Sequence, residues 1–133
     1  MSTHTRGLLI TALGLVLAAT LACGSNSTTG PTAGTLTVSL TTPNADDGAM
    51  LLTVSGPDMT QIAAEDTSLY VGYAQDGTTV TAVLVGDLQG GPLVTFHVPD
   101  VDAVSSYSAT ITQVADRSNV LRASLTGYAL TVE

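Results

Sequence analysis

Short runs in which apolar residues alternate with threonine and serine constrain the fold of this chain more than any other feature. The clearest run, residues 35–41, reads TLTVSLT. Successive side chains of a β-strand point to opposite faces, so a period of two predicts a strand with one buried face and one exposed face. Residues 49–55 repeat the pattern, with Met50, Leu52 and Val54 on the same side.

Similar runs lie between turn signals along the rest of the chain. We expect further strands at 59–63, 69–73, 80–85, 93–98, 107–113, 120–123 and 128–132. The pair Asp76-Gly77 is typical of a tight β-hairpin. The run at 80–85 is almost continuously apolar, which predicts a strand in the middle of a sheet. Residues 86–92 read as a loop, and 100–105 as a loop or a short helical turn.

Eight or nine short strands with no long helix predict an all-β fold. The arrangement that fits is a single antiparallel β-sandwich, Ig-like or jelly-roll, over residues 35–133. About 100 residues can bury a core of their own. The chain has one cysteine, so no disulfide can form within it.

The first 22 residues have the pattern of a secretion signal. Residues 1–6 carry one positive charge, Arg6, and residues 7–22 are uncharged and mostly apolar. This apolar run is shorter than the roughly 20 residues that a spanning helix needs, which favours a cleaved signal peptide. An uncleaved membrane anchor is the alternative that remains open.

Residues 20–23, TLAC, resemble the lipobox of bacterial lipoproteins. Ala22 is the small residue expected before the cysteine, whereas Thr20 stands where leucine is usual. The resemblance implies cleavage before Cys23, attachment of lipid to its thiol, and, because Gly24 follows, sorting to the outer membrane. Cleavage of an ordinary secreted protein near Ala22 remains an alternative.

Residues 24–34, GSNSTTGPTAG, have no charge and no large apolar side chain. Such a composition is typical of a flexible linker. We therefore expect three parts: a signal peptide at 1–22, a lipidated cysteine with its linker at 23–34, and the sandwich at 35–133.

The charge balance excludes some partners. The chain has 11 acidic residues and three basic ones, and only Arg117 and Arg122 lie beyond the signal. Nucleic-acid binding needs a basic face, which two arginines cannot build. Contact with a membrane would therefore come through the lipid.

Few residues could carry catalysis. His97 is the only histidine after residue 22. It falls opposite Val94, Phe96 and Val98 in its predicted strand, so we expect it on the surface. A zinc site needs three or four ligands, and no nucleophile-elbow motif is present. We therefore expect a protein that is not an enzyme.

Two turns are rich in possible calcium ligands. Asn44, Asp46 and Asp47 lie in one turn, and Asp100 and Asp102 lie in another. Loop carboxylates and amides are the oxygen ligands that calcium prefers, although the same residues also start turns without any metal.

The tyrosines divide into two groups. Tyr70 is out of phase with its apolar neighbours, so it is the candidate for an exposed contact with a glycan or small ligand. Tyr107 and Tyr128 are in phase with core positions. We expect these two to cap the core, each with its hydroxyl group on a backbone group.

The order of four segments, LTVSL, AMLLTVSGP, TVTAVLVGDLQGGPLVTFHVPDV and SYSATITQVA, resembles a cohesin-type β-sandwich. Cohesins imply calcium-assisted docking between proteins outside the cell. Together these observations predict a lipid-anchored envelope protein whose sandwich binds other envelope proteins. The alternative is a calcium-assisted module that binds a glycan or small ligand. No cofactor other than calcium is expected.

Overall fold

The computed structural model describes residues 30–133 of the chain. The expected signal peptide, Cys23 and most of the expected linker lie outside the described residues. Among the helices of residues 30–133, none has the length and apolar character to cross a membrane.

Strands and one 3₁₀ helix make up the regular structure. They are β1 (Gly34–Thr41), β2 (Asp47–Ser55), β3 (Thr60–Ala64), β4 (Tyr70–Asp76), β5 (Thr79–Leu88), β6 (Gly91–Val98), η1 (Val101–Ser106), β7 (Ser108–Asp116) and β8 (Ala129–Val132). The predicted all-β fold is confirmed, and of the two alternatives left open at 100–105, a loop or a short helical turn, the structure has the helical turn.

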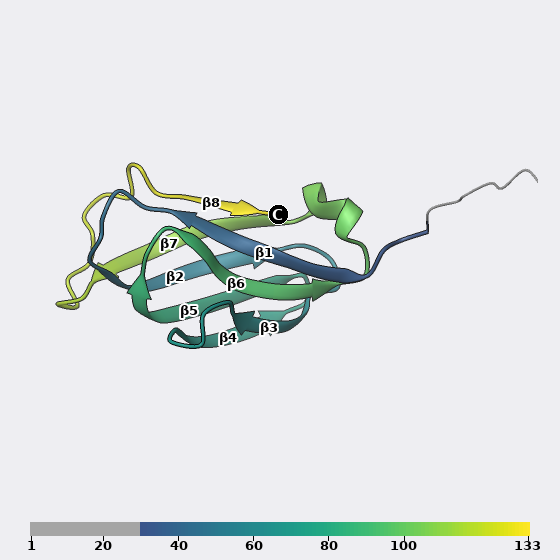
Figure 1. Cartoon of the computed structure of the whole chain (residues 1–133), viewed down its shortest axis with the longest axis horizontal. Helices are drawn as coiled ribbons and strands as arrows, with labels where there is room; N and C mark the ends of the chain where they lie inside the picture. The colour runs from purple at the N-terminus through teal and green to yellow at the C-terminus, as the bar shows by residue number, and fades with distance from the viewer. Residues whose placement is uncertain (1–29) are drawn as a thin grey trace, which may run out of the picture.

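The strands form two antiparallel sheets that pack face to face as a sandwich (Figure 1). The first sheet has the order β3-β6-β1-β8, and the second has the order β4-β5-β2-β7. Strand β5 lies between β4 and β2, which confirms the central place predicted from its apolar run.

The core lies between the two sheets and follows from the alternation in the sequence. One side of β1 contributes Leu36, Val38 and Leu40, and one side of β2 contributes the expected Met50, Leu52 and Val54, all nearly fully buried. Burial of each such side chain contributes about 1.5 to 3 kcal/mol. The ring of Tyr107 packs against Phe96 with centroids 5.6 Å apart.

The structure corrects the prediction in three places. Residues 86–92 are not one loop, because β5 continues to a fully buried Leu88 and β6 begins at Gly91. A register shift between Asp47 and Ala49 in β2 brings Leu88 opposite Asp47. The strand expected at 120–123 is reduced to one bridge, between Leu121 and Ala115.

The third correction concerns β4. The strand expected at 69–73 puts Leu69, Val71 and Tyr73 on one side, but Tyr73 is 50% exposed. Strand β4 is at the edge of its sheet, so a side chain at this position has no outer neighbour to cover it.

The sandwich has two different ends. At the entry end, the chain arrives before β1 and meets η1: the N–H of Thr32 donates to the Asp100 carboxylate over 3.2 Å, and the N–H of Val101 donates to the Thr32 carbonyl over 2.8 Å. At the far end lie the β1–β2 turn and the segment after β7, residues 117–128 (Figure 1).

Candidate binding surface

The outer face of the first sheet is polar. The outward side chains of β1, β6 and β8 are almost all small hydroxyl or polar groups: Thr35, Thr37, Ser39, Thr41, Thr95, His97 and Thr131. His97 is half-buried and lies opposite the buried Phe96 and Val98 within its strand, as predicted. This face has the polar-out pattern usual for an antiparallel sheet that covers a core on one side.

The outer face of the second sheet is divided into two halves. Toward the entry end its outward residues are Thr53 and Ser55 on β2, paired with Thr81 and Thr79 on β5. Toward the far end the outward residues become apolar. We call the residues of this half the apolar patch: Ala49, Leu51, Val83, Val85, Ala115 and Leu121.

Several side chains of the apolar patch are open to solvent. Val83 is 38% exposed, Val85 47% and Leu121 59%. Tyr70, 65% exposed, flanks them on β4, where it pairs with Val85. Its ring lies beside Gly72. A Cβ atom placed on Gly72 would be 3.3 Å from the Tyr70 ring and 3.4 Å from the Val83 side chain. Contiguous exposed apolar surface of this kind often marks a site of contact with another molecule.

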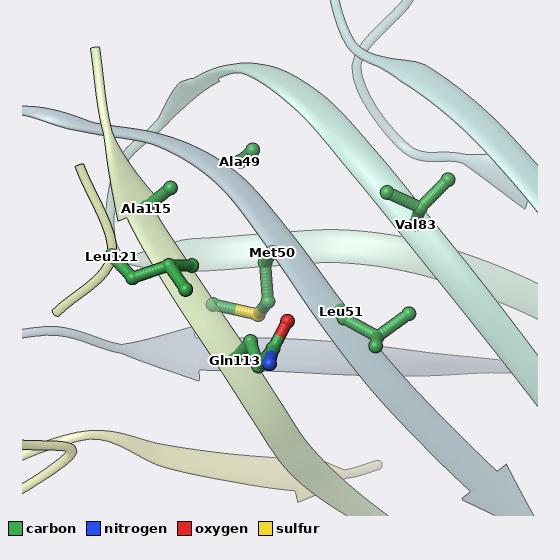
Figure 2. A pocket seen from close by; sticks show the side chains of 7 residues that line it. All are labelled: Ala49, Met50, Leu51, Val83, Gln113, Ala115 and Leu121. Carbon is green, nitrogen blue, oxygen red and sulfur yellow. The ribbon is translucent and has the colours of Figure 1, made fainter. Parts of the chain in front are cut away.

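A shallow hollow of about 120 Å³ lies within the apolar patch. Figure 2 shows Leu51 and Val83 projecting from neighbouring strands and Leu121 reaching across β7 from the following segment. Met50 lies at the hollow although its side chain is almost fully buried. Two small residues, Ala49 and Ala115, leave the room between these larger side chains.

The turn after β7 places Leu121 over the sheet. The carboxylate of Asp116 accepts hydrogen bonds from the N–H groups of Ser118 and Val120, over 2.8 and 3.0 Å. Asn119 adopts a left-handed conformation with φ of 63°, which asparagine tolerates better than most residues. A turn at residues 116–119 therefore returns the chain against β7.

A buried carboxylate fastens this returning segment to the far end. Asp47 is fully buried, and it accepts hydrogen bonds from Thr42 (2.6 Å), from the Tyr128 hydroxyl (2.8 and 2.9 Å), and from Arg122 through Nε (3.0 Å) and Nη2 (2.8 Å). Arg122 also pairs with Asp46. Because Arg122 follows Leu121 directly, this polar cluster holds one wall of the apolar hollow.

The cluster stays ionised. Burial alone would raise the pKa of Asp47, but the hydrogen bonds from Thr42, Tyr128 and Arg122 outweigh it and hold the pKa below its ordinary value. The hydrogen bonds to Asp47 and Asp46 in turn raise the pKa of Arg122. A buried charge that is paired and fully hydrogen-bonded is tolerated, whereas an unpaired one is not.

A second, more polar hollow of about 380 Å³ continues from the first. It begins one position further along two strands, at Gly48 and Asp116, and is also lined by Val85, Gly86, Asp87, Arg117 and Asn119. Arg117 forms an ion pair with Asp87 across it. The surface at the far end therefore combines an apolar hollow with carboxylates beside it.

The predicted calcium ligands do not meet in one site. Asn44, Asp46 and Asp47 lie at the far end, and Asp100 and Asp102 lie at the entry end, where the Asp100 carboxylate accepts from the Asp102 N–H over 3.1 Å. Both carboxylate oxygens of Asp47 already accept protein hydrogen bonds. Within residues 30–133 no group of three or more acidic, histidine or cysteine side chains could hold a metal ion. Calcium binding stays a prediction.

The tyrosines follow the sequence analysis in part. Tyr70 is exposed, and Tyr107 is buried with its hydroxyl donating to the Pro57 carbonyl over 2.9 Å, both as predicted. Tyr128 differs, because its hydroxyl contacts the Asp47 carboxylate and accepts from the Asn44 side chain over 2.7 Å. A role for Tyr70 in glycan binding stays a prediction.

The apolar patch was missed at the level of sequence, although a signal for it was present. Alternation fails where Leu51 is followed by Leu52, and again from Ala82 to Val85. We interpreted the second run as a strand in the middle of a sheet, which it is, but drew no conclusion about its outer face. In the structure nothing among the described residues covers its outer face.

Comparison with known proteins identifies no relative. No protein family, no curated protein and no solved structure matches the chain. The resemblances to bacterial lipoproteins and to cohesins therefore stay predictions.

Proposed function

We propose that this chain is a lipid-anchored protein of the bacterial cell envelope whose sandwich binds another protein through the apolar patch. The observation that carries the binding role is the exposure of Val83, Val85 and Leu121 on one outer face of an otherwise polar domain, with Leu51 between Val83 and Leu121. Exposed apolar surface is costly to keep in water, so a partner that covers it gains binding free energy.

The position of the patch fits an anchor on Cys23. The chain enters the sandwich at the end where Thr32 contacts Asp100, whereas Ala49 and Val85 lie toward the opposite end. A linker of about 11 residues reaches roughly 20 Å, about the length of a short strand. A partner can therefore cover the patch without displacing the domain from the membrane.

Protein contact is favoured over small-ligand binding by the shape of the surface. The hollow in the patch holds about 120 Å³, well below the roughly 300 Å³ at which small-molecule pockets begin. The larger hollow beside it is open and is crossed by the Arg117–Asp87 ion pair. Interfaces between proteins commonly use such shallow surfaces with one or two apolar anchors.

Site-specific crosslinking in the cells that make the protein tests the binding role. A photo-crosslinking amino acid replaces Val83 in the full chain, and the matched control carries it in place of Thr37 on the outer face of the first sheet. We expect a discrete larger product from position 83, absent from position 37 and lost when Leu51→Lys is added. Equal products from both positions, or none from position 83, would rule out the patch as the contact surface.

Fractionation tests the anchor separately. Replacing Cys23→Ala should move the protein out of the membrane fraction and change its mobility, because the thiol that would carry lipid is gone. An unchanged membrane association would show that lipid on Cys23 is not what holds the protein there.

A further inference from the structure

We propose that the segment bound at the apolar patch is basic: a polypeptide that places one aliphatic side chain in the hollow and a lysine or arginine beside it. This inference rests on the proposed binding function and specifies the chemistry of the partner. It draws on the size of the hollow, the charges around it, and the ion pairs that the two arginines form.

The hollow accepts a single aliphatic group. Its volume of about 120 Å³ is a little smaller than a 150 Å³ cavity that holds one benzene ring. Its walls are apolar except for Gln113, whose uncharged amide is the one polar side chain that lines it. A leucine, isoleucine, valine or methionine side chain therefore fits it, and a charged group would lose its hydration there without a partner.

The next side chain of the bound segment meets carboxylates. The second hollow, which continues from the first, is lined by Asp87 and Asp116. Asp66 lies nearby, because its carboxylate accepts a hydrogen bond from the Ser68 N–H over 2.8 Å and residues 68 and 69 pack against Gly86, which lines this hollow. Hydrogen bonds to Ser68 lower the pKa of Asp66, which keeps it charged near neutral pH.

The positively charged side chains of the domain already form ion pairs within it. Residues 30–133 contain no lysine, and their two arginines are both in ion pairs: Arg117 with Asp87, and Arg122 with Asp46 and Asp47. Arg117 therefore offsets Asp87, whereas Asp116 and Asp66 have no ion pair within residues 30–133 and leave negative charge in excess beside the apolar patch. A partner that covers the patch must bring the opposite charge or bear the repulsion.

The excess of acidic over basic residues also argues against a second copy of this chain as the partner that covers the patch. Two copies that join their patches would bring Asp116 and Asp66 of each chain close together, and no lysine or arginine of residues 30–133 pairs with these carboxylates. Like charges that face each other across an interface disfavour it. The occupant that the charges favour is a different, basic polypeptide.

Binding of three synthetic peptides tests this inference. Each has seven residues that alternate leucine and threonine, and they differ only in the flanking residues, which are lysine, glutamine or glutamate. The full chain is held in nanodiscs of uncharged phosphatidylcholine, and fluorescence anisotropy of the labelled peptides gives the affinity. Empty nanodiscs measure binding to the lipid alone.

We expect the lysine peptide to bind about tenfold more tightly than the glutamine peptide at low salt, and the glutamate peptide to bind least. The preference should shrink at about 1 M salt, where the Debye length is near 3 Å. Leu51→Thr should weaken the lysine peptide, and Thr95→Ser on the first sheet should not.

Each of the other possible results would contradict this inference, the proposed function, or both. Equal affinities with loss of binding in Leu51→Thr would leave the proposed function standing and remove the basic partner. Tight binding of the lysine peptide that Leu51→Thr does not weaken would place the basic contact elsewhere and overturn this inference. Binding of none of the peptides would contradict both the inference and the patch as a contact surface.

Discussion

The two outer faces of the sandwich have the same architecture and different chemistry. Each belongs to a four-stranded antiparallel sheet that covers the same core. The first carries Thr35, Thr37 and Thr95, whereas the second carries Leu51, Val83 and Val85 at the matching outward positions of its central strands. The first face shows that this fold needs no apolar residues on its outside. This difference supports the proposal that the apolar patch is a contact surface.

The two faces also differ in how they are supported. Beside the second face, the returning segment 117–122 is held by the buried Asp47 and its partners. None of residues 117–122 is buried or packs against the core cluster, so this segment depends on polar contacts and one strand bridge. The contact surface thus rests on a cluster of charges at the far end.

The largest effect is expected from removing that cluster. Asp47→Ala leaves Arg122 and Tyr128 without their buried partner and should lower the free energy of unfolding by about 3 kcal/mol. Urea denaturation of the full chain measures this loss. In NMR spectra, amide shifts should change at Leu121 and stay constant at Thr95. A loss of less than about 1 kcal/mol, or equal changes in amide shift on both faces, would show that the cluster does not support the patch.

The next effect is a dependence on pH. The folded state holds the pKa of Asp47 below the ordinary value of 3.8, so the unfolded chain binds a proton more readily than the folded one. The stabilisation from Asp47 is present above pH 4 and is lost as the pH falls through the lower, folded pKa. Thermal denaturation should show this acid-side loss in the wild type and a smaller loss in Asp47→Asn. Identical slopes in the two proteins would contradict it.

A smaller effect on stability accompanies conversion of the second face into a copy of the first. The triple change Leu51→Thr, Val83→Thr and Val85→Thr should cost less than about 1 kcal/mol per site, because threonine suits exposed strand positions. It should abolish crosslinking through the patch. The matched change Thr37→Ser should alter neither property. Retained crosslinking in the triple variant would show that the apolar side chains are not the contact.

The smallest effect is expected at Tyr70, which flanks the patch at the edge of the sheet. Tyr70→Ala should weaken binding of the lysine peptide by about 1 kcal/mol, as is common for an aromatic residue at the rim of an interface. Tyr70→Phe should leave it nearly unchanged, because the ring supplies most of the apolar area that Tyr70 exposes beside the patch. If the phenylalanine variant weakens binding equally, the hydroxyl makes the contact.

The sequence predicted the strands and most of the core, because a period of two along β1, β2 and β6 is a local signal. It did not predict that Asp47 would be buried. Arg122 and Tyr128 lie 75 and 81 residues further along the chain, and only the fold brings them to it. Local spacing alone made Asp46 and Asp47 resemble a solvated turn with calcium ligands.

The apolar patch was hidden for a related reason. An apolar run such as Ala82 to Val85 looks the same whether its second face is covered within the domain or by a partner. Only the arrangement of the two sheets shows that the outer face of β5 has no covering layer among residues 30–133.

The reactivity of single cysteines in intact cells tests the central claim most directly. Val83→Cys and Thr37→Cys variants of the full chain are labelled with a small maleimide, both in cells and after purification. Occupied by a partner, position 83 should react far more slowly in cells than in the purified protein, whereas position 37 should react equally in both. Equal reactivity of position 83 in cells and after purification would contradict the claim that the second outer face is a protein contact surface.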